Sequence, residues 1–132
     1  MKRSAPLRRF PMRRRYRVTG PDQQTRDIVR ARHWGRCEIC DTGQVEHVHH
    51  RLPRGIGSSR DPRINRPSNL LAVCADCHRY VEQHRAEALT AGWLVSRWDD
   101  PARVPVLIER GARYVHLADD GSYRLDPPER VA

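Results

Sequence analysis

The sequence is poor in several features that would define a class of protein. Lys2 is the only lysine among 25 basic residues, there is one phenylalanine, and aromatic residues make up 6% of the 132 positions. Mean hydropathy is −0.81, and no apolar run approaches the roughly 20 residues of a membrane span. No apolar stretch follows Met1-Lys2-Arg3, so we expect no secretory signal. These absences exclude a transmembrane protein and favour one small cytoplasmic domain.

The positive charge is concentrated at one end of the chain. Net charge is +9, which favours a polyanion as partner, although the arginine bias is also what a GC-rich genome produces. Residues 1–36 hold twelve basic residues and two acids, whereas basic and acidic residues are balanced, seven and seven, in 37–92, and nearly so, six and seven, in 93–132. Residues 1–20 have little apolar content, and we expect a disordered arm. The arm either neutralises nucleic-acid phosphates or is only a solubilising tail.

The pattern of apolar residues and turn formers predicts an α+β fold. One domain over 21–95 lies between the arm and a C-terminal extension over 96–132. We expect Tyr80, Trp93 and Leu94 in the core. The predicted elements are helices over 21–34 and 75–91, ended by Gly35 and Gly92, strands over 45–50 and 70–73, a loop over 54–68, a strand beginning at 93–95, and a β-hairpin over 106–117.

The four cysteines form two Cys-x-x-Cys pairs, Cys37/Cys40 and Cys74/Cys77. Two intervening residues allow both thiolates of a pair to reach one ion at about 2.3 Å. Two disulfides and a redox dithiol are the alternatives. Disulfides are disfavoured without a secretion signal, and a redox dithiol needs no second pair. The spacing therefore predicts a four-cysteine structural zinc site, which is closed to substrate and does not catalyse.

Histidines and an asparagine occur in a fixed order around these pairs. His49-His50-Arg51-Leu52-Pro53 comes between them, Asn69-Leu70-Leu71 precedes the second pair, and His78 follows Cys77. His49 and His50 are adjacent on a predicted strand, so their side chains face opposite ways and suit different tasks. A neutral imidazole is a suitable general base at cellular pH, because it can take the proton of an attacking water. If the substrate were a phosphodiester, its hydrolysis would need this base and, in addition, the charge stabilisation that a divalent ion supplies.

This ordered set resembles the HNH endonucleases, whose fold is a small ββα-metal core. The resemblance covers about residues 26–95, and the surrounding sequence is similar to small HNH proteins of actinobacterial phages. It implies a ββα-metal core held together by the zinc site, with an N-terminal helix and a C-terminal β-hairpin added. It also implies a magnesium or manganese ion, DNA as substrate, and action beside a phage terminase in genome packaging.

The resemblance also implies a role for each site residue. His50 would be the general base, and Asn69 would orient it through a backbone carbonyl of the loop. His49 and His78 would hold the catalytic ion. Glu82 shares a helical face with His78 and is the candidate third ligand. The arginines nearest the base, which we expect to grip the phosphates beside the cut, are Arg51 and Arg54.

Two other classes of function compete with a nuclease. A zinc-stabilised module could bind nucleic acid without cutting it, but such a module needs no imidazole base. A zinc-bound structural or interaction protein would leave the whole histidine pattern unexplained. The sequence therefore favours a DNA endonuclease of low sequence specificity.

Overall fold

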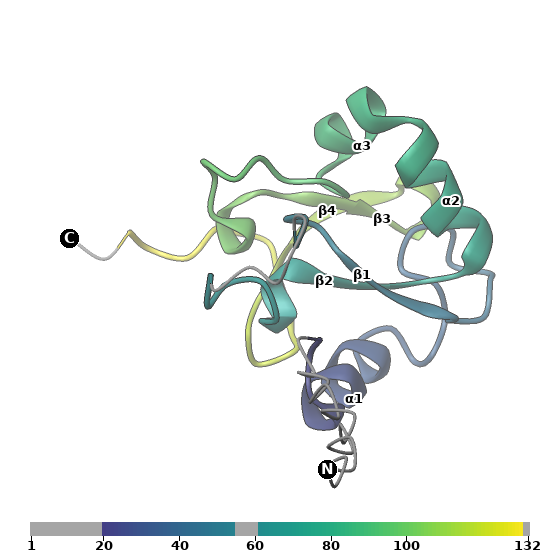
Figure 1. Ribbon diagram of the computed structural model, residues 1–132, viewed down its shortest axis with the longest axis horizontal. Helices are drawn as coiled ribbons and strands as arrows, with labels where there is room; N and C mark the ends of the chain where they lie inside the picture. Colours follow the sequence, from purple (N-terminus) through teal and green to yellow (C-terminus); the bar gives the residue numbers. More distant parts are fainter. Residues whose placement is uncertain (1–19, 55–60, 131–132) are drawn as a thin grey trace, which may run out of the picture.

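The computed structural model describes residues 20–54 and 61–130, in which three α-helices and two small antiparallel sheets occur (Figure 1). The predicted α+β class is confirmed. The predicted arm, apart from Gly20, and residues 55–60 of the predicted loop lie outside the described residues. No helix in the described ranges has the length and apolar composition to cross a bilayer. The elements are α1 (Gln23–Ala31), β1 (His47–His50), the 3-10 helix η1 (Pro67–Asn69), β2 (Leu70–Val73), α2 (Ala75–Gln83), α3 (Arg85–Ala91), η2 (Pro101–Arg103), β3 (Val106–Ile108), η3 (Glu109–Gly111), β4 (Arg113–Leu117) and β5 (Tyr123–Arg124).

Helix α1 begins at Gln23, two residues after the predicted start, and Asp22 caps it. The Asp22 carboxylate accepts a hydrogen bond from the backbone N–H of Thr25 at 2.8 Å, which satisfies a donor in the first helical turn. The helix ends at Ala31, earlier than the predicted end at Trp34. Gly35, with a φ of 75°, then turns the chain toward the first cysteine pair.

Strands β1 and β2 form a two-stranded sheet that separates two packed layers. His49 lies opposite Leu71, and His50 lies opposite Leu70. Side chains alternate along a strand, and opposed residues of an antiparallel pair share a face. Leu70 packs with Val29 of α1, whereas Leu71 belongs to the main core on the other face. The sheet therefore places His50 on the α1 side and His49 on the α2 side.

The predicted helix over 75–91 is two helices, with His84 between them. The backbone of His84 has φ −126° and ψ 61°, outside the helical region, and its Nδ1 lies 3.0 Å from the carbonyl oxygen of Tyr80. Tyr80 was predicted in the core but is 40% exposed. Its hydroxyl donates to Glu87 at 2.5 Å, so the phenol is satisfied at the surface. The predicted end at Gly92 is confirmed by its φ of 77°.

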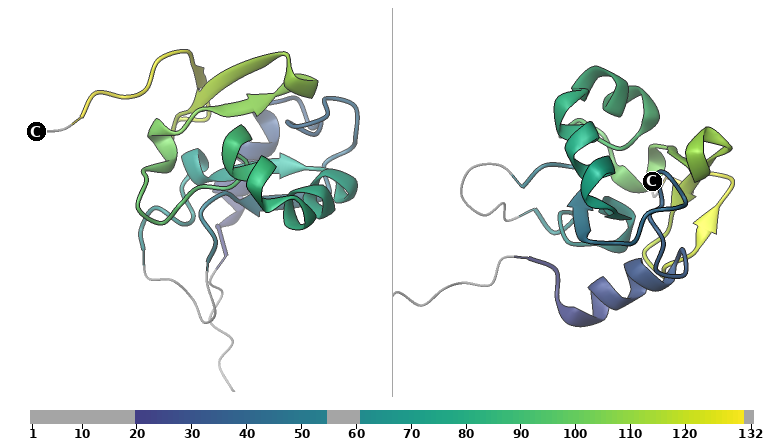
Figure 2. Two further views of the ribbon diagram at one scale, coloured as in Figure 1. Left: turned by 90° about the horizontal axis from the view of Figure 1, so that it is seen from above. Right: turned by 90° about the vertical axis from the view of Figure 1, so that its right-hand side faces the viewer.

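The predicted C-terminal hairpin is confirmed as β3 and β4, and β5 adds a third strand after the turn at Asp120-Gly121. This sheet packs over the same core as β2 and α2, and its β5 end comes close to α1, where Gly121 lies against Ile28 (Figure 2). Residues 93–95 are buried but irregular, so the strand predicted to begin there is wrong. The main core includes Leu71, Val73, Val81, Val106, Ile108, Val115 and Leu117.

A buried ion pair joins α1 to both sheets. The guanidinium of Arg32 donates to the two oxygens of Glu38 at 2.6 and 2.8 Å, and both side chains are almost fully buried. Glu38 also accepts from the Tyr123 hydroxyl at 2.7 Å and from the backbone N–H of Ala72 at 2.8 Å. Both carboxylate oxygens are therefore satisfied, as a buried charge requires. Because Glu38 lies inside the first Cys-x-x-Cys, this network also fixes that loop.

Candidate active site and metal centre

The two cysteine pairs converge as predicted. The Sγ atoms of Cys37, Cys40, Cys74 and Cys77 all lie within 4.8 Å of one another, and those of Cys40 and Cys74 are 3.9 Å apart. Thiolates at 2.3 Å from a tetrahedral zinc ion would be separated by about 3.8 Å. In the described residues the four cysteines are free, without a disulfide. The cluster fits a structural zinc site.

Backbone groups around the cluster are suited to thiolates. The N–H of Gly43 donates to the Cys40 sulfur at 3.3 Å, and the N–H of Cys77 donates to the Cys74 sulfur at 3.4 Å. Burial disfavours the Cys40 thiolate, but hydrogen bonds from Thr42 and Gly43 outweigh it and lower the pKa of this thiol to about 6. Burial raises the pKa of Cys37 and Cys77 instead, so the positive charge of a bound ion would be needed to keep those two thiols ionised.

His49 is held so that one ring nitrogen stays available. Its Nε2 lies 2.8 Å from the carbonyl oxygen of Trp93, and a carbonyl can only accept, so Nε2 carries the proton and Nδ1 the lone pair. Burial lowers the pKa of His49 to about 4, which keeps the ring neutral. A neutral imidazole whose other nitrogen donates to a backbone carbonyl is the usual arrangement of a metal-binding histidine.

The other two predicted ligands of the catalytic ion lie together on α2. Nε2 of His78 is 3.6 Å from the Glu82 carboxylate, one helical turn further on. The ring centres of His49 and His78 are 5.4 Å apart. Two imidazoles and a carboxylate suit a divalent cation such as manganese. Across the described residues, however, only the four cysteines are gathered closely enough to form a preformed metal cluster.

His50 lies on the opposite face of β1 and has its own partner. Its Nε2 is 2.9 Å from the side-chain oxygen Oδ1 of Asn65, so Nε2–H donates and the lone pair is on Nδ1. Burial lowers the pKa of His50 below its ordinary value, although the bond to Asn65 opposes this shift. The neutral form, which a general base requires, is therefore favoured at neutral pH.

Asn69 is fully buried and ties the loop to the end of β1. Its Oδ1 accepts from the N–H of Leu52 at 2.7 Å, and its Nδ2 donates to the carbonyl oxygens of Leu52 at 3.3 Å and Ile64 at 2.9 Å. Ile64 directly precedes Asn65, the partner of His50. The side chain of Asn69 thus binds the loop next to Asn65, and none of its hydrogen bonds within the described residues goes to His50.

The prediction that Arg51 grips a phosphate is wrong. Arg51 is completely buried, and its guanidinium donates at 2.7–2.9 Å to four backbone carbonyl oxygens. These carbonyls come from distant segments of the chain, so the side chain holds the fold together and cannot contact DNA. The carbonyl oxygens belong to Gly92, Ser68, Pro101 and Val104.

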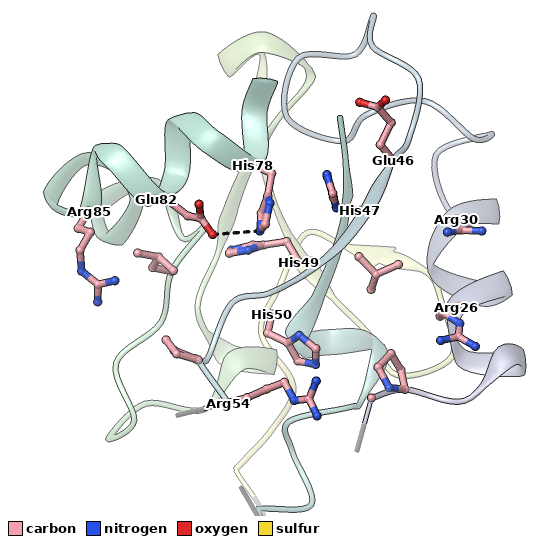
Figure 3. A pocket seen from close by; sticks show the side chains of 15 residues that line it. Arg26, Arg30, Glu46, His47, His49, His50, Arg54, His78, Glu82 and Arg85 are labelled. Atoms are coloured by element: carbon pink, nitrogen blue, oxygen red, sulfur yellow. Dashed lines mark ion pairs between the residues drawn. The ribbon is translucent and has the colours of Figure 1, made fainter. Parts of the chain in front are cut away.

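One pocket of about 610 Å³ brings most of the other predicted residues together (Figure 3). It is lined by His49, His50, His78, Glu82 and Arg54, which come from β1, α2 and the segment after β1. Asn69 and the four cysteines do not line this pocket. The further charged or imidazole side chains that line it are Arg26, Arg30, Glu46, His47 and Arg85.

Two further residues, His47 and Asn65, lie beside the predicted ones. The ring of His47 lies 4.8 Å from that of His78, centre to centre. Alternation along the strand could have placed His47 on the same face as His49. Asn65, the partner of His50, lies in a loop where no periodic signal exists.

Compared with known proteins, the sequence matches no family model and no curated protein, and the fold matches no solved structure.

Proposed function

We propose that the protein is a metal-dependent endonuclease of the HNH type that hydrolyses phosphodiester bonds of DNA. The observation that supports it best is the pocket around β1. On one side of this strand lies a neutral histidine, His50, and on the other side lie His49, His78 and Glu82. A nuclease needs a base and a cation-binding group at one phosphate, and the two sets of side chains share one opening.

In this proposal His50 accepts at Nδ1 the proton of the attacking water. The water oxygen bonds to phosphorus, the bond to the 3′ oxygen breaks, and that oxygen takes up a proton. His49, His78 and Glu82 would hold a magnesium or manganese ion, which when bound supplies positive charge at the phosphate and at the leaving oxygen. Asn69 is a positioning residue that acts on His50 through the loop.

Arg54 remains the arginine proposed to contact the phosphates next to the cut. It lines the pocket, and its positive charge also contributes to lowering the pKa of His50. The proposed setting, taken from the resemblance, is phage genome packaging beside a terminase. The four cysteines would bind zinc and keep the fold intact.

A plasmid assay tests the proposal. Supercoiled DNA is incubated with the protein and magnesium or manganese, and nicked and linear products are measured. We expect cutting by the wild type and a loss of at least about 100-fold for His50→Ala, the range given by removal of a general base. His84→Ala is the matched control, because His84 is exposed and does not line the pocket.

The competing function is a zinc-stabilised module that binds nucleic acid without cutting it. Zinc content and thermal unfolding of each variant show whether it is folded. A folded wild type that binds plasmid but never cuts it would favour the binding module, as would equal cutting by wild type and His50→Ala.

A further inference from the structure

The pocket is open along the free edge of β1, between α1 and the α2–α3 pair. The β1–β2 sheet has two strands, so β1 has no neighbour on its other side within the described residues. His50 faces α1 and His49 faces α2, yet both line the same pocket. A ligand that reaches both side chains must therefore pass over this edge, with α1 on one flank and α3 on the other (Figure 3).

The flank formed by α1 carries two arginines at the pocket. Arg26 and Arg30 are one helical turn apart, so they share a face of α1, and both line the pocket. Arg30 is exposed and Arg26 is half-buried, with one hydrogen bond to the side chain of Gln23 at 3.3 Å. Neither guanidinium forms an ion pair with a carboxylate of the described chain.

The opposite flank carries Arg85, the first residue of α3. It is exposed, lines the pocket, and likewise has no ion pair among the described residues. Six other arginines differ, since each pairs with an acid within 4 Å: Arg32, Arg36, Arg63, Arg79, Arg113 and Arg124. Arg26, Arg30 and Arg85 stand on both flanks of one opening and form no ion pair within 4 Å, which suits a ligand that brings several phosphates, although Glu46 and Glu82 also line the pocket.

We propose that α1 and α3 are the two walls of a DNA-binding groove. Arg26 and Arg30 bind backbone phosphates on one side of the cut and Arg85 on the other, so that the scissile phosphate lies over the edge of β1. This inference rests on the proposed nuclease function for its substrate. It adds three binding residues outside the histidine, asparagine and cysteine pattern. It also assigns α1 a role in binding the DNA backbone.

Salt-dependent binding tests the groove without requiring cleavage. His50→Ala serves as background, and affinity for a short fluorescent DNA duplex is measured over a range of salt concentrations. The logarithm of the binding constant falls linearly with the logarithm of salt concentration, and each lost phosphate contact makes this negative slope shallower by about 0.9. We expect the slope to become shallower by about 1.8 in R26Q/R30Q and by about 0.9 in R85Q.

The control is R110Q/R124Q, which removes the same charge from two exposed arginines outside the pocket. The slope of this variant should stay close to that of the background. Equal slopes for the two double variants would overturn the groove, and if the wild type still cuts plasmid the nuclease proposal survives. If the wild type never cuts DNA, but the salt dependence of binding weakens only in the pocket variants, the groove is supported and the nuclease proposal is contradicted. Zinc content and thermal unfolding confirm that each variant is folded.

Discussion

The Nε–H of Arg51 donates to the carbonyl oxygen of Gly92 at 2.7 Å, across 41 residues of sequence. Gly92 ends α3 with a φ of 77°, and a side chain in place of its hydrogen would lie 2.0 Å from the carbonyl oxygen of Pro105. The bond therefore joins the segment after β1, which carries the site, to the point where α3 meets the C-terminal sheet. A charged side chain from the histidine motif thus holds distant segments of the fold together.

The first prediction concerns this arginine. Arg51→Met keeps much of the volume but removes the hydrogen-bond donor of the Gly92, Ser68 and Val104 carbonyl oxygens, whereas that of Pro101 still accepts from the N–H of Val104. We expect a loss of about 4 kcal/mol in the free energy of unfolding, measured by urea denaturation. Arg54→Met, in a half-buried position at the pocket, should lose less than about 1 kcal/mol. An Arg51→Met protein of normal stability but weakened DNA binding would restore the phosphate role.

The second prediction concerns the cysteine cluster. A Cβ at Gly43 would lie 2.7 Å from the Cβ of Cys74 and 2.9 Å from its sulfur. Gly43→Ala should therefore displace that ligand and cost about 2 kcal/mol, equivalent to a roughly 30-fold loss of zinc affinity. Competition with a chelating dye measures this. Gly20→Ala is the control, since its Cβ meets no atom within 4 Å. Equal zinc affinity in both variants would contradict the steric argument.

The third prediction separates the two metal centres. Loss of a partner of a metal ligand commonly costs 10–100-fold in affinity, and a direct ligand costs more. We expect His78→Ala to weaken Mn²⁺ binding about 100-fold or more, followed by the electron paramagnetic resonance signal of free Mn²⁺. Its zinc content should be unchanged, and His84→Ala should bind Mn²⁺ like the wild type. Undiminished Mn²⁺ binding by both His78→Ala and Glu82→Ala would remove these residues from the site.

The fourth prediction tests Asn69 as a positioning residue. Asn69→Ala should lower kcat about 10–100-fold with little change in KM, because the base is misplaced and DNA contacts remain. Unfolding should become easier by about 1–3 kcal/mol, so rates are compared where the variant is folded. If Asn69 acts through Asn65, the double alanine variant should lose little more than either single variant. Fully additive losses would show that the two act separately.

Local patterns predicted much of this molecule. Alternation along a strand was enough to place His49 and His50 on opposite faces, and the spacing of the cysteines was enough to predict their cluster. Glycine after each helix predicted where the chain turns, at Gly35 and Gly92. In each case the determining contact is close in sequence or follows from a regular period.

The errors came from contacts that no period encodes. Arg51 was predicted at the surface because arginine usually lies there, yet its partners are carbonyl oxygens 17 to 53 residues away. The buried pair of Arg32 and Glu38 was missed for the same reason, because satisfying it requires β5 and β2 together. The break at His84 depends on a side-chain nitrogen near the preceding turn, which apolar spacing does not register.

Cys74 is both a member of the metal cluster and the residue that begins α2, because its sulfur accepts from the backbone N–H of Cys77. His78 follows Cys77 in the chain and Glu82 comes one helical turn later, so the helix that carries two ligands of the proposed catalytic ion begins at one of the four cysteines. A chelator would therefore be expected to abolish the proposed activity in two ways, by removing the zinc that holds the fold and by removing the proposed catalytic ion. Inhibition by EDTA alone says nothing about which ion does the chemistry, and restoring activity requires zinc to be returned before magnesium or manganese.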